Sequence, residues 1–204
     1  MPAAPSRRRG PYAKSAATRA ALLEAAVAAF GESGYNGASL RDIAARANVT
    51  QTGLLHHFPS KVALLEAVLD ERDSADFTAI SEFLGEGSSV IDALILLVER
   101  NQRQRPIIEL YTALSAEATS EDHPAHAYFQ RRYARVGAEL AADFAKLRDD
   151  GMLREGVSPQ SAARITMAAL DGLQVQWLLA LSDEDAEPVD MVAEARQFLS
   201  LLLR

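Results

Sequence analysis

Residues 39–57 read SLRDIAARANVTQTGLLHH, and this stretch decides the fold class of the N-terminal part of the chain. Its pattern predicts two short helices, over 39–47 and 50–57, joined by a tight turn, which is the size and spacing of a helix-turn-helix. Ser39 and Thr50 are suited to cap the two helices, with Asp42 three residues after Ser39 as a weaker capping box. A small apolar wedge would lock the helices at a steep angle: Ile43, Ala44, Val49 and Leu54.

The second short helix begins with residues that suit a DNA base better than a protein core. Thr50, Gln51, Thr52 and Gly53 are small or hydrogen-bonding. Glutamine pairs bidentately with adenine, and threonine bonds a base edge or touches a thymine methyl. A short helix pair is by itself a weak signal, because helical cores contain many.

Working outward, helical periodicity continues on both sides of this motif. An apolar face runs from Ser15 to about Glu32, and the cluster at 34–37 should end that helix. After Pro59-Ser60 another helix is expected from Lys61 to about Leu84.

Taken whole, residues 17–69 resemble the N-terminal domain of the TetR/AcrR family of bacterial regulators. The resemblance lies in an ordered set: Leu23, Ala26, Phe30, Gly34-Tyr35, Ser39, Ile43-Ala44, Val49, Leu54, His57-Phe58 and Lys61. It implies that the second short helix enters the major groove, that Lys61 contacts a phosphate, and that Ser39 and Arg41 lie near the opposite strand. The residues implied to face DNA from the second helix are Thr50, Gln51, Thr52, Gly53, Leu55 and His56.

Leu55 departs from the family pattern, which usually has tyrosine there. Leucine keeps an apolar contact and loses the hydrogen bond of the tyrosine hydroxyl. His56 either compensates for that loss or is an ordinary solvated histidine. His57 is expected to pack at the helix end and Phe58 to lie in the core.

The rest of the chain also predicts helices, so the expected fold class is all-α: an N-terminal three-helix DNA-binding domain and a C-terminal helical effector and dimerisation domain. Further helices are expected over about 90–103, 106–118, 125–150, 159–181 and 188–203, the last opened by Pro188. The predicted division is a basic flexible arm at 1–14, the helix-turn-helix domain at 15–60, and the effector domain at 61–204.

The net charge of −7 hides an asymmetry. Eight basic residues stand against three acidic ones up to Lys61, a net +5, and 13 against 25 beyond it, a net −12. Such asymmetry is typical of a nucleic-acid-facing module joined to an acidic one, because phosphate neutralisation needs only local positive charge. A basic arm on an ordinary domain would also account for it.

The last two helices are expected to form a homodimer interface, so that the operator would be a near-palindrome. They carry more apolar residues than two terminal helices can bury alone: Leu178, Leu179, Leu181, Phe198, Leu199, Leu201, Leu202 and Leu203. The Asp171-Gly172 pair and Trp177 look like the penultimate helix of a subgroup of the family.

A small-molecule effector is expected among the middle helices, where aromatic and polar residues mix. The candidate contacts are Tyr111, Glu117, Tyr128, Phe129, Met167, Asp171, Gln174 and Trp177, with Tyr133 beside them. Each could equally be a core or interface residue, and Asp171 needs a partner or a cap if it is buried. No basic cluster is apparent in these helices, so the effector is expected to be largely apolar with one or two polar groups.

Two other classes of protein remain open. His123 and His126, beside Glu121 and Asp122, resemble a metal cluster, but Pro124 marks a helix start where such residues are ordinary caps. An all-helical metal enzyme or a helical interaction module is therefore the alternative. The chain has no cysteine, glycine-rich phosphate loop or Gly-x-Ser-x-Gly, so neither an enzyme nor a cofactor is expected. No apolar run reaches the roughly 18 residues of a membrane helix, and a cytoplasmic protein without a signal peptide is expected.

Overall fold

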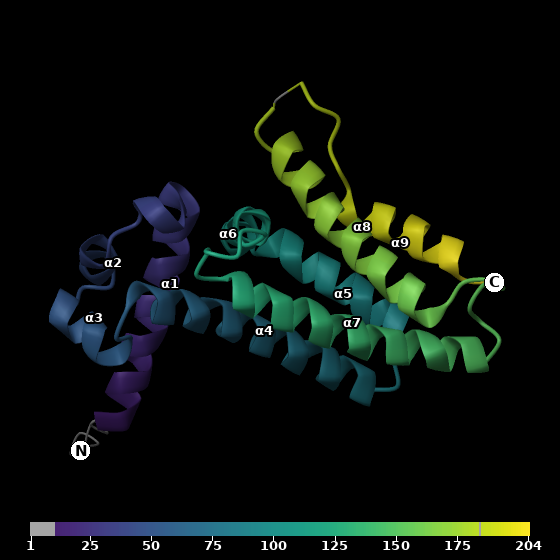
Figure 1. The fold of residues 1–204 in the computed structure, drawn as a ribbon, viewed down its shortest axis with the longest axis horizontal. Coiled ribbons are helices and arrows are strands. Elements are labelled where there is room, and N and C mark those ends of the chain that lie inside the picture. Colours follow the sequence, from purple (N-terminus) through teal and green to yellow (C-terminus); the bar gives the residue numbers. More distant parts are fainter. Residues whose placement is uncertain (1–10, 184) are drawn as a thin grey trace, which may run out of the picture. The chain divides into compact units, whose positions relative to one another are not determined.

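The computed structural model describes residues 11–183 and 185–204, and over these residues the fold is all-α, as predicted (Figure 1). The helices are α1 (Pro11–Gly37), α2 (Leu40–Arg46), α3 (Gln51–His57), α4 (Lys61–Gly85), α5 (Val90–Arg103), α6 (Arg105–Glu117), α7 (His126–Asp149), α8 (Pro159–Ala180) and α9 (Met191–Leu202). The chain divides into two compact units at the Val68–Leu69 bond, within α4. The prediction had put the division at residues 60 and 61.

The first helix is longer at both ends than the sequence pattern predicted. It begins at Pro11, inside the segment expected to be an arm, and the remainder of that segment lies outside the described residues. At its other end α1 continues to Gly37 across one non-helical residue, Gly34, whose φ is +68°. Glycine adopts this left-handed conformation without steric cost, so the breaker cluster bends the helix where it was expected to end it.

Asn48 sets the turn between α2 and α3. Its φ of +55° is a left-handed conformation that asparagine tolerates better than most residues. At the end of α2, Val49 N donates to Ala44 O at 2.9 Å. Helix α2 packs on α3, and Ile43, Ala44 and Leu54 are almost fully buried. The two helices form the helix-turn-helix that was predicted.

The second unit is built from the remainder of α4 and helices α5 to α9. α8 packs along α7 and beside α9, and α9 also packs on α5 (Figure 1). Ser89 and Ser158 cap α5 and α8, and Pro159 follows Ser158 in the first turn of α8. The expected start of the last helix at Pro188 is wrong. α9 begins at Met191, because the Asp190 side chain accepts hydrogen bonds from two backbone N–H groups there.

A short antiparallel bridge joins the segment after α7 to the segment after α9. Leu153 pairs with Leu203, Arg154 N donates to Leu202 O, and Arg204 N donates to Met152 O, both at 2.9 Å. The bridge holds the end of α9 beside the connection that leads into α8.

None of the described helices is both long enough and apolar enough to cross a membrane.

Candidate nucleic-acid interface and ligand cavity

Helix α3 has one buried side and one polar, exposed side. Leu54 is fully buried and anchors the helix. Gln51, Thr52, Leu55 and His56 are exposed. The buried leucine fixes the rotation of α3 about its axis. The hydrogen-bonding side chains of the first turn of α3 are therefore exposed, where they could reach a base edge.

Thr50 and Gly53 form the start of α3 together. The Thr50 hydroxyl oxygen accepts a hydrogen bond from Gly53 N at 3.1 Å. A Cβ at position 53 would lie 3.3 Å from that oxygen, tighter than an ordinary contact. Glycine therefore allows a close cap, and it leaves open backbone at the exposed start of the helix.

Lys61, the first residue of α4, is held by the end of α1. Its Nζ donates to Asn36 O at 3.2 Å and lies 4.6 Å from the centre of the Tyr35 ring. Burial lowers the pKa of the Lys61 ammonium and raises the pKa of the Tyr35 hydroxyl. The ammonium has three donors, so these contacts leave capacity for a phosphate oxygen.

If Lys61 contacts a phosphate, Lys61→Ala should weaken binding to all duplexes alike, because a phosphate carries no sequence information. The slope of log affinity against log salt should become shallower by about one. Fluorescence anisotropy over a range of salt concentrations measures both effects. Lys146→Ala is the control, since Lys146 is an exposed lysine of the second unit paired with Asp143. Equal slopes of log affinity against log salt for the two variants would show that Lys61 does not contact a phosphate.

Two other polar residues of this region, Ser39 and Arg46, form hydrogen bonds within the protein. The Ser39 hydroxyl caps α2, accepting from Asp42 N at 3.1 Å and donating to an Asp42 carboxylate oxygen at 2.6 Å. Arg46 donates to both carboxylate oxygens of Glu32, which lowers the pKa of the Glu32 carboxyl. Arg41 is exposed. The sequence count of basic residues therefore overstates the positive charge available to DNA, because Arg46 is neutralised.

The second unit contains a partly open cavity of about 70 Å³ between α4, α5, α6, α7 and α8, called the inner cavity below. Of the predicted ligand contacts, Tyr111, Met167, Asp171 and Gln174 line it. The other four lie elsewhere. Glu117 is exposed at the end of α6, Phe129 packs on the Tyr111 ring at 5.1 Å, Trp177 is buried in α8, and Tyr128 donates to Leu69 O at 3.2 Å.

Two arginines, Arg72 and Arg132, also line this cavity, and the sequence analysis did not predict them. The Arg72 guanidinium lies 3.9 Å from the centre of the Tyr111 ring, and that of Arg132 lies 4.8 Å from it. The expectation of no basic cluster in the middle helices is therefore wrong. The two arginines are 60 positions apart in the sequence, on α4 and α7. No local sequence pattern could therefore predict that they lie at the same ring.

Carboxylates of α4 partner these arginines. Asp73 accepts from Arg132 at 2.8 Å and from Arg135 at 3.0 Å. Asp76 lies 3.9 Å from Arg72 and 3.8 Å from Arg100. Burial raises the pKa of the Asp76 carboxyl, against the lowering effect of the two arginines. Burial also raises the pKa of the Tyr111 hydroxyl.

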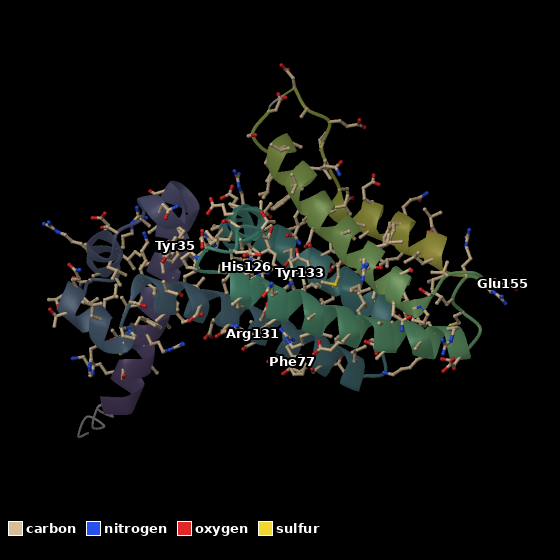
Figure 2. All side chains as sticks on the ribbon, viewed as in Figure 1. Tyr35, Phe77, His126, Arg131, Tyr133 and Glu155 are labelled. Carbon is tan, nitrogen blue, oxygen red and sulfur yellow. The ribbon has the colours of Figure 1, made fainter. Side chains whose placement is uncertain are left out.

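An open groove of about 700 Å³ lies over α7 and α8, floored by alanines and Gly137. Tyr133, seen on α7 in Figure 2, lines it and donates to Asp171 at 2.6 Å. Burial and this hydrogen bond raise the pKa of the Tyr133 hydroxyl. Asp171 and Met167 line both hollows, so they form a wall between the groove and the inner cavity.

The histidines after α6 form structural contacts. His126 Nδ1 is 2.8 Å from Ala118 O, and His123 Nε2 is 3.4 Å from a Glu117 carboxylate oxygen. Over the residues that the structure describes, no group of three or more histidines and carboxylates could hold a metal ion.

Helices α8 and α9 expose apolar side chains. Ile165, Val175 and Leu179 of α8 and Leu201 of α9 are 42–65% exposed. With Ala168 and Gly172, the α8 residues follow a three-and-four spacing that places them on one stripe. Leu199 and Leu202, by contrast, are buried within the chain. The apolar surplus seen in the sequence thus divides between a core and an exposed surface.

Comparison with known proteins matches two families in succession. Residues 22–68 match "Bacterial regulatory proteins, tetR family", and residues 90–204 match "BetI-type transcriptional repressor, C-terminal". The A-factor receptor protein of Streptomyces griseus is 28% identical over 88% of this chain, and the match spans 60% of that receptor's length. The regulator BetI of Burkholderia mallei is 27% identical over 86% of each chain.

A solved structure, Salmonella enterica GusR, superposes with a TM-score of 0.71 at 28% identity, covering 91% of this chain and 95% of that one. The two family matches together span both units, and the helix-turn-helix lies inside the first. The chain belongs to the TetR family of bacterial transcriptional regulators.

Proposed function

We propose that the protein is a transcriptional repressor that binds a near-palindromic operator as a homodimer and is released by a small molecule. The observation that carries the proposal is α3: a buried Leu54 anchors it while Gln51 and Thr52 are exposed at its start, in a unit that matches tetR-family regulators. The protein acts by binding, without catalysis or a cofactor, in the cytoplasm where its DNA lies.

In this proposal α3 reads the major groove. Gln51 and Thr52 contact base edges, with Thr50 and Gly53 beside them at the helix start. Leu55 and His56 contact the DNA further along, while Lys61, Ser39 and Arg41 position the backbone. The Thr50 hydroxyl oxygen accepts from Gly53 N, and its O–H is still available to donate to DNA.

The proposed dimer surface is the exposed apolar stripe of Ile165, Val175 and Leu179 on α8 together with Leu201 on α9. Exposed apolar residues at this spacing on neighbouring helices suit an isologous four-helix contact. A two-fold dimer presents two copies of α3, which is why the operator should be a near-palindrome with half-sites about one helical turn, or a multiple of it, apart.

Release requires that the effector bind one state of the protein better than the other. The inner cavity of about 70 Å³ is smaller than the roughly 300–1,000 Å³ typical of ligand pockets, so a larger ligand would favour a state with parted helices. Helix α4 lines the cavity with Arg72 and begins at Lys61. A coupling of about 1–3 kcal/mol would lower operator affinity roughly 5- to 150-fold.

Selection of bound sequences from random duplex DNA tests the repressor proposal. A near-palindrome should emerge, and its occurrences should identify the regulated genes. If DNA affinity falls with salt concentration but no sequence is enriched, the protein binds DNA without sequence specificity. The absence of any salt-dependent binding would favour a helical interaction module instead.

We expect Gln51→Ala to lower affinity for the selected operator by about 1–3 kcal/mol and to relax preference at one or two base pairs. The reason is that a bidentate amide contact to a base would be lost. The measurement is repeated selection with the variant, followed by titration. Gln130→Ala, an exposed glutamine on α7, should change neither. An unchanged base preference for Gln51→Ala would contradict direct readout at this position.

A further inference from the structure

Three buried polar atoms of residues that line the inner cavity have no hydrogen-bond partner among the described residues. They are Arg72 Nη1, Tyr111 Oη and Thr166 Oγ1. Their side chains are 9%, 1% and 0% exposed, respectively. Buried polar groups are nearly always paired, so three unpaired groups at one cavity indicate a site for a ligand or ordered solvent. All three can donate a hydrogen bond.

The carboxylates around the cavity do not use these donors. Asp73 is occupied by Arg132 and Arg135, and Asp171 by the Tyr133 hydroxyl. Asp76 is 3.9 Å from Arg72, a distance that gives charge attraction without a hydrogen bond. The three donors are therefore unpaired although a carboxylate, Asp171, also lines the cavity, because that carboxylate accepts from Tyr133 and not from them.

A cation is disfavoured in the same place. The face of an aromatic ring is what attracts a quaternary ammonium ion. The Tyr111 ring is already engaged by the guanidinium groups of Arg72 and Arg132, at 3.9 and 4.8 Å. A further cation here would be repelled by both arginines.

The remainder of the lining is mostly apolar: Leu94, Leu97, Val98, Val136, Leu140 and Leu170, beside Asn101, Gln174, Met167 and Asp171. This lining suits a hydrocarbon body. At about 70 Å³ the cavity holds roughly five waters, at 10–15 Å³ each, so the body must be short unless the helices part.

We propose that the effector is a small monoanion, a carboxylate with a short apolar body, whose oxygens accept hydrogen bonds from Arg72, Tyr111 and Thr166. The inference rests on the proposed function in taking the ligand to be the regulator's effector. A carboxylate here would compete with Asp76 for Arg72. Because Arg72 is on α4, the helix that begins at Lys61, the ion contacts of α4 differ between the free and bound protein.

The test compares three unbranched probes of four carbon atoms each that differ in the polar head: butyrate, 1-butanol and butylammonium. Binding is measured on the full-length protein by thermal shift and isothermal titration calorimetry. Butyrate should bind and raise the melting temperature, and the alcohol and the ammonium should bind at least tenfold more weakly. Equal binding of butyrate and 1-butanol, or preferential binding of butylammonium, would overturn the proposal.

Two near-isosteric variants separate a ligand contact from a structural role. Tyr111→Phe and Thr166→Val each delete an unpaired hydroxyl, so neither should lower the melting temperature without butyrate. Each should weaken butyrate binding roughly tenfold, because a hydrogen bond to a charged group is lost. Unchanged butyrate affinity in both variants would contradict the assignment, as would a large loss of stability without butyrate.

Arg72→Gln, which removes the guanidinium, should abolish the preference for butyrate over 1-butanol. Its matched control is Arg131→Gln, an exposed arginine on α7 that does not line the cavity (Figure 2). The ratio of the two affinities is compared within one variant, so altered stability does not affect it. A preference retained in Arg72→Gln would overturn the proposal.

Operator binding is measured separately with the selected duplex. Butyrate binding without release from DNA would support the ligand class and contradict its role as effector. Loss of DNA binding altogether would contradict the repressor function and leave the butyrate measurement standing.

Discussion

Replacing both Leu179 and Leu201 by aspartate should convert the protein to monomers and lower operator affinity roughly thousandfold, to near the level of non-specific binding. Leu179 is 65% and Leu201 55% exposed, and a dimer formed on this surface would bury both. A charge there would have to be desolvated in the dimer. A monomer presents one copy of α3 and loses half of the operator contacts. Sedimentation and operator titration measure the two effects.

Phe77→Asp is the matched control, because Phe77 is a 58% exposed aromatic on α4, away from α8 and α9 (Figure 2). This variant should remain dimeric. Leu199 and Leu202 are unsuitable positions for the test, although the sequence suggests them, because they are buried and aspartate there would unfold the subunit. Intact dimers of the Leu179/Leu201 variant would show that the interface lies elsewhere.

Asp73→Ala should destabilise the second unit by about 3 kcal/mol. Asp73 is largely buried and accepts from both Arg132 and Arg135, so its removal leaves the buried Arg132 guanidinium without its carboxylate partner. Urea unfolding followed by the fluorescence of Trp177, the single tryptophan, reports on the unit concerned.

Glu139→Ala provides the comparison for Asp73→Ala. Glu139 also pairs with Arg135, at 3.6 Å, but both side chains are about half exposed. Exposed pairs contribute about 0–1 kcal/mol, so this change should be small. Similar effects of the two substitutions would mean that burial of the Asp73 pair contributes nothing.

Local sequence signals predicted most of the helices. Ser39 and Thr50 were predicted as caps and start α2 and α3, because a capping side chain and the helix that it starts lie in one short segment. The errors are also local. Pro188 looked like a helix start, but the Asp190 side chain satisfies the first N–H groups better, and Gly34 bends α1 without ending it.

The candidate sites were predicted unevenly for a physical reason. The reading face of α3 is a short continuous segment, so its composition is visible in the sequence. The cavity is assembled from five helices, and the contact of Arg72 and Arg132 with Tyr111 joins residues that are 21 to 60 positions apart. Tyr111 and Asp171 could be suspected from their own surroundings, but the charge around them depends on long-range packing.

The bridge between Leu153 and Leu203 affects how subunits would come together. It fastens the end of α9 beside the start of α8, so the stripe that we propose for dimerisation is ordered within a single chain. Association then requires little further loss of conformational entropy, unlike a dimer whose helices fold only on meeting. Two differently tagged preparations should therefore exchange partners as folded subunits, and mixed dimers should appear on mixing without denaturant.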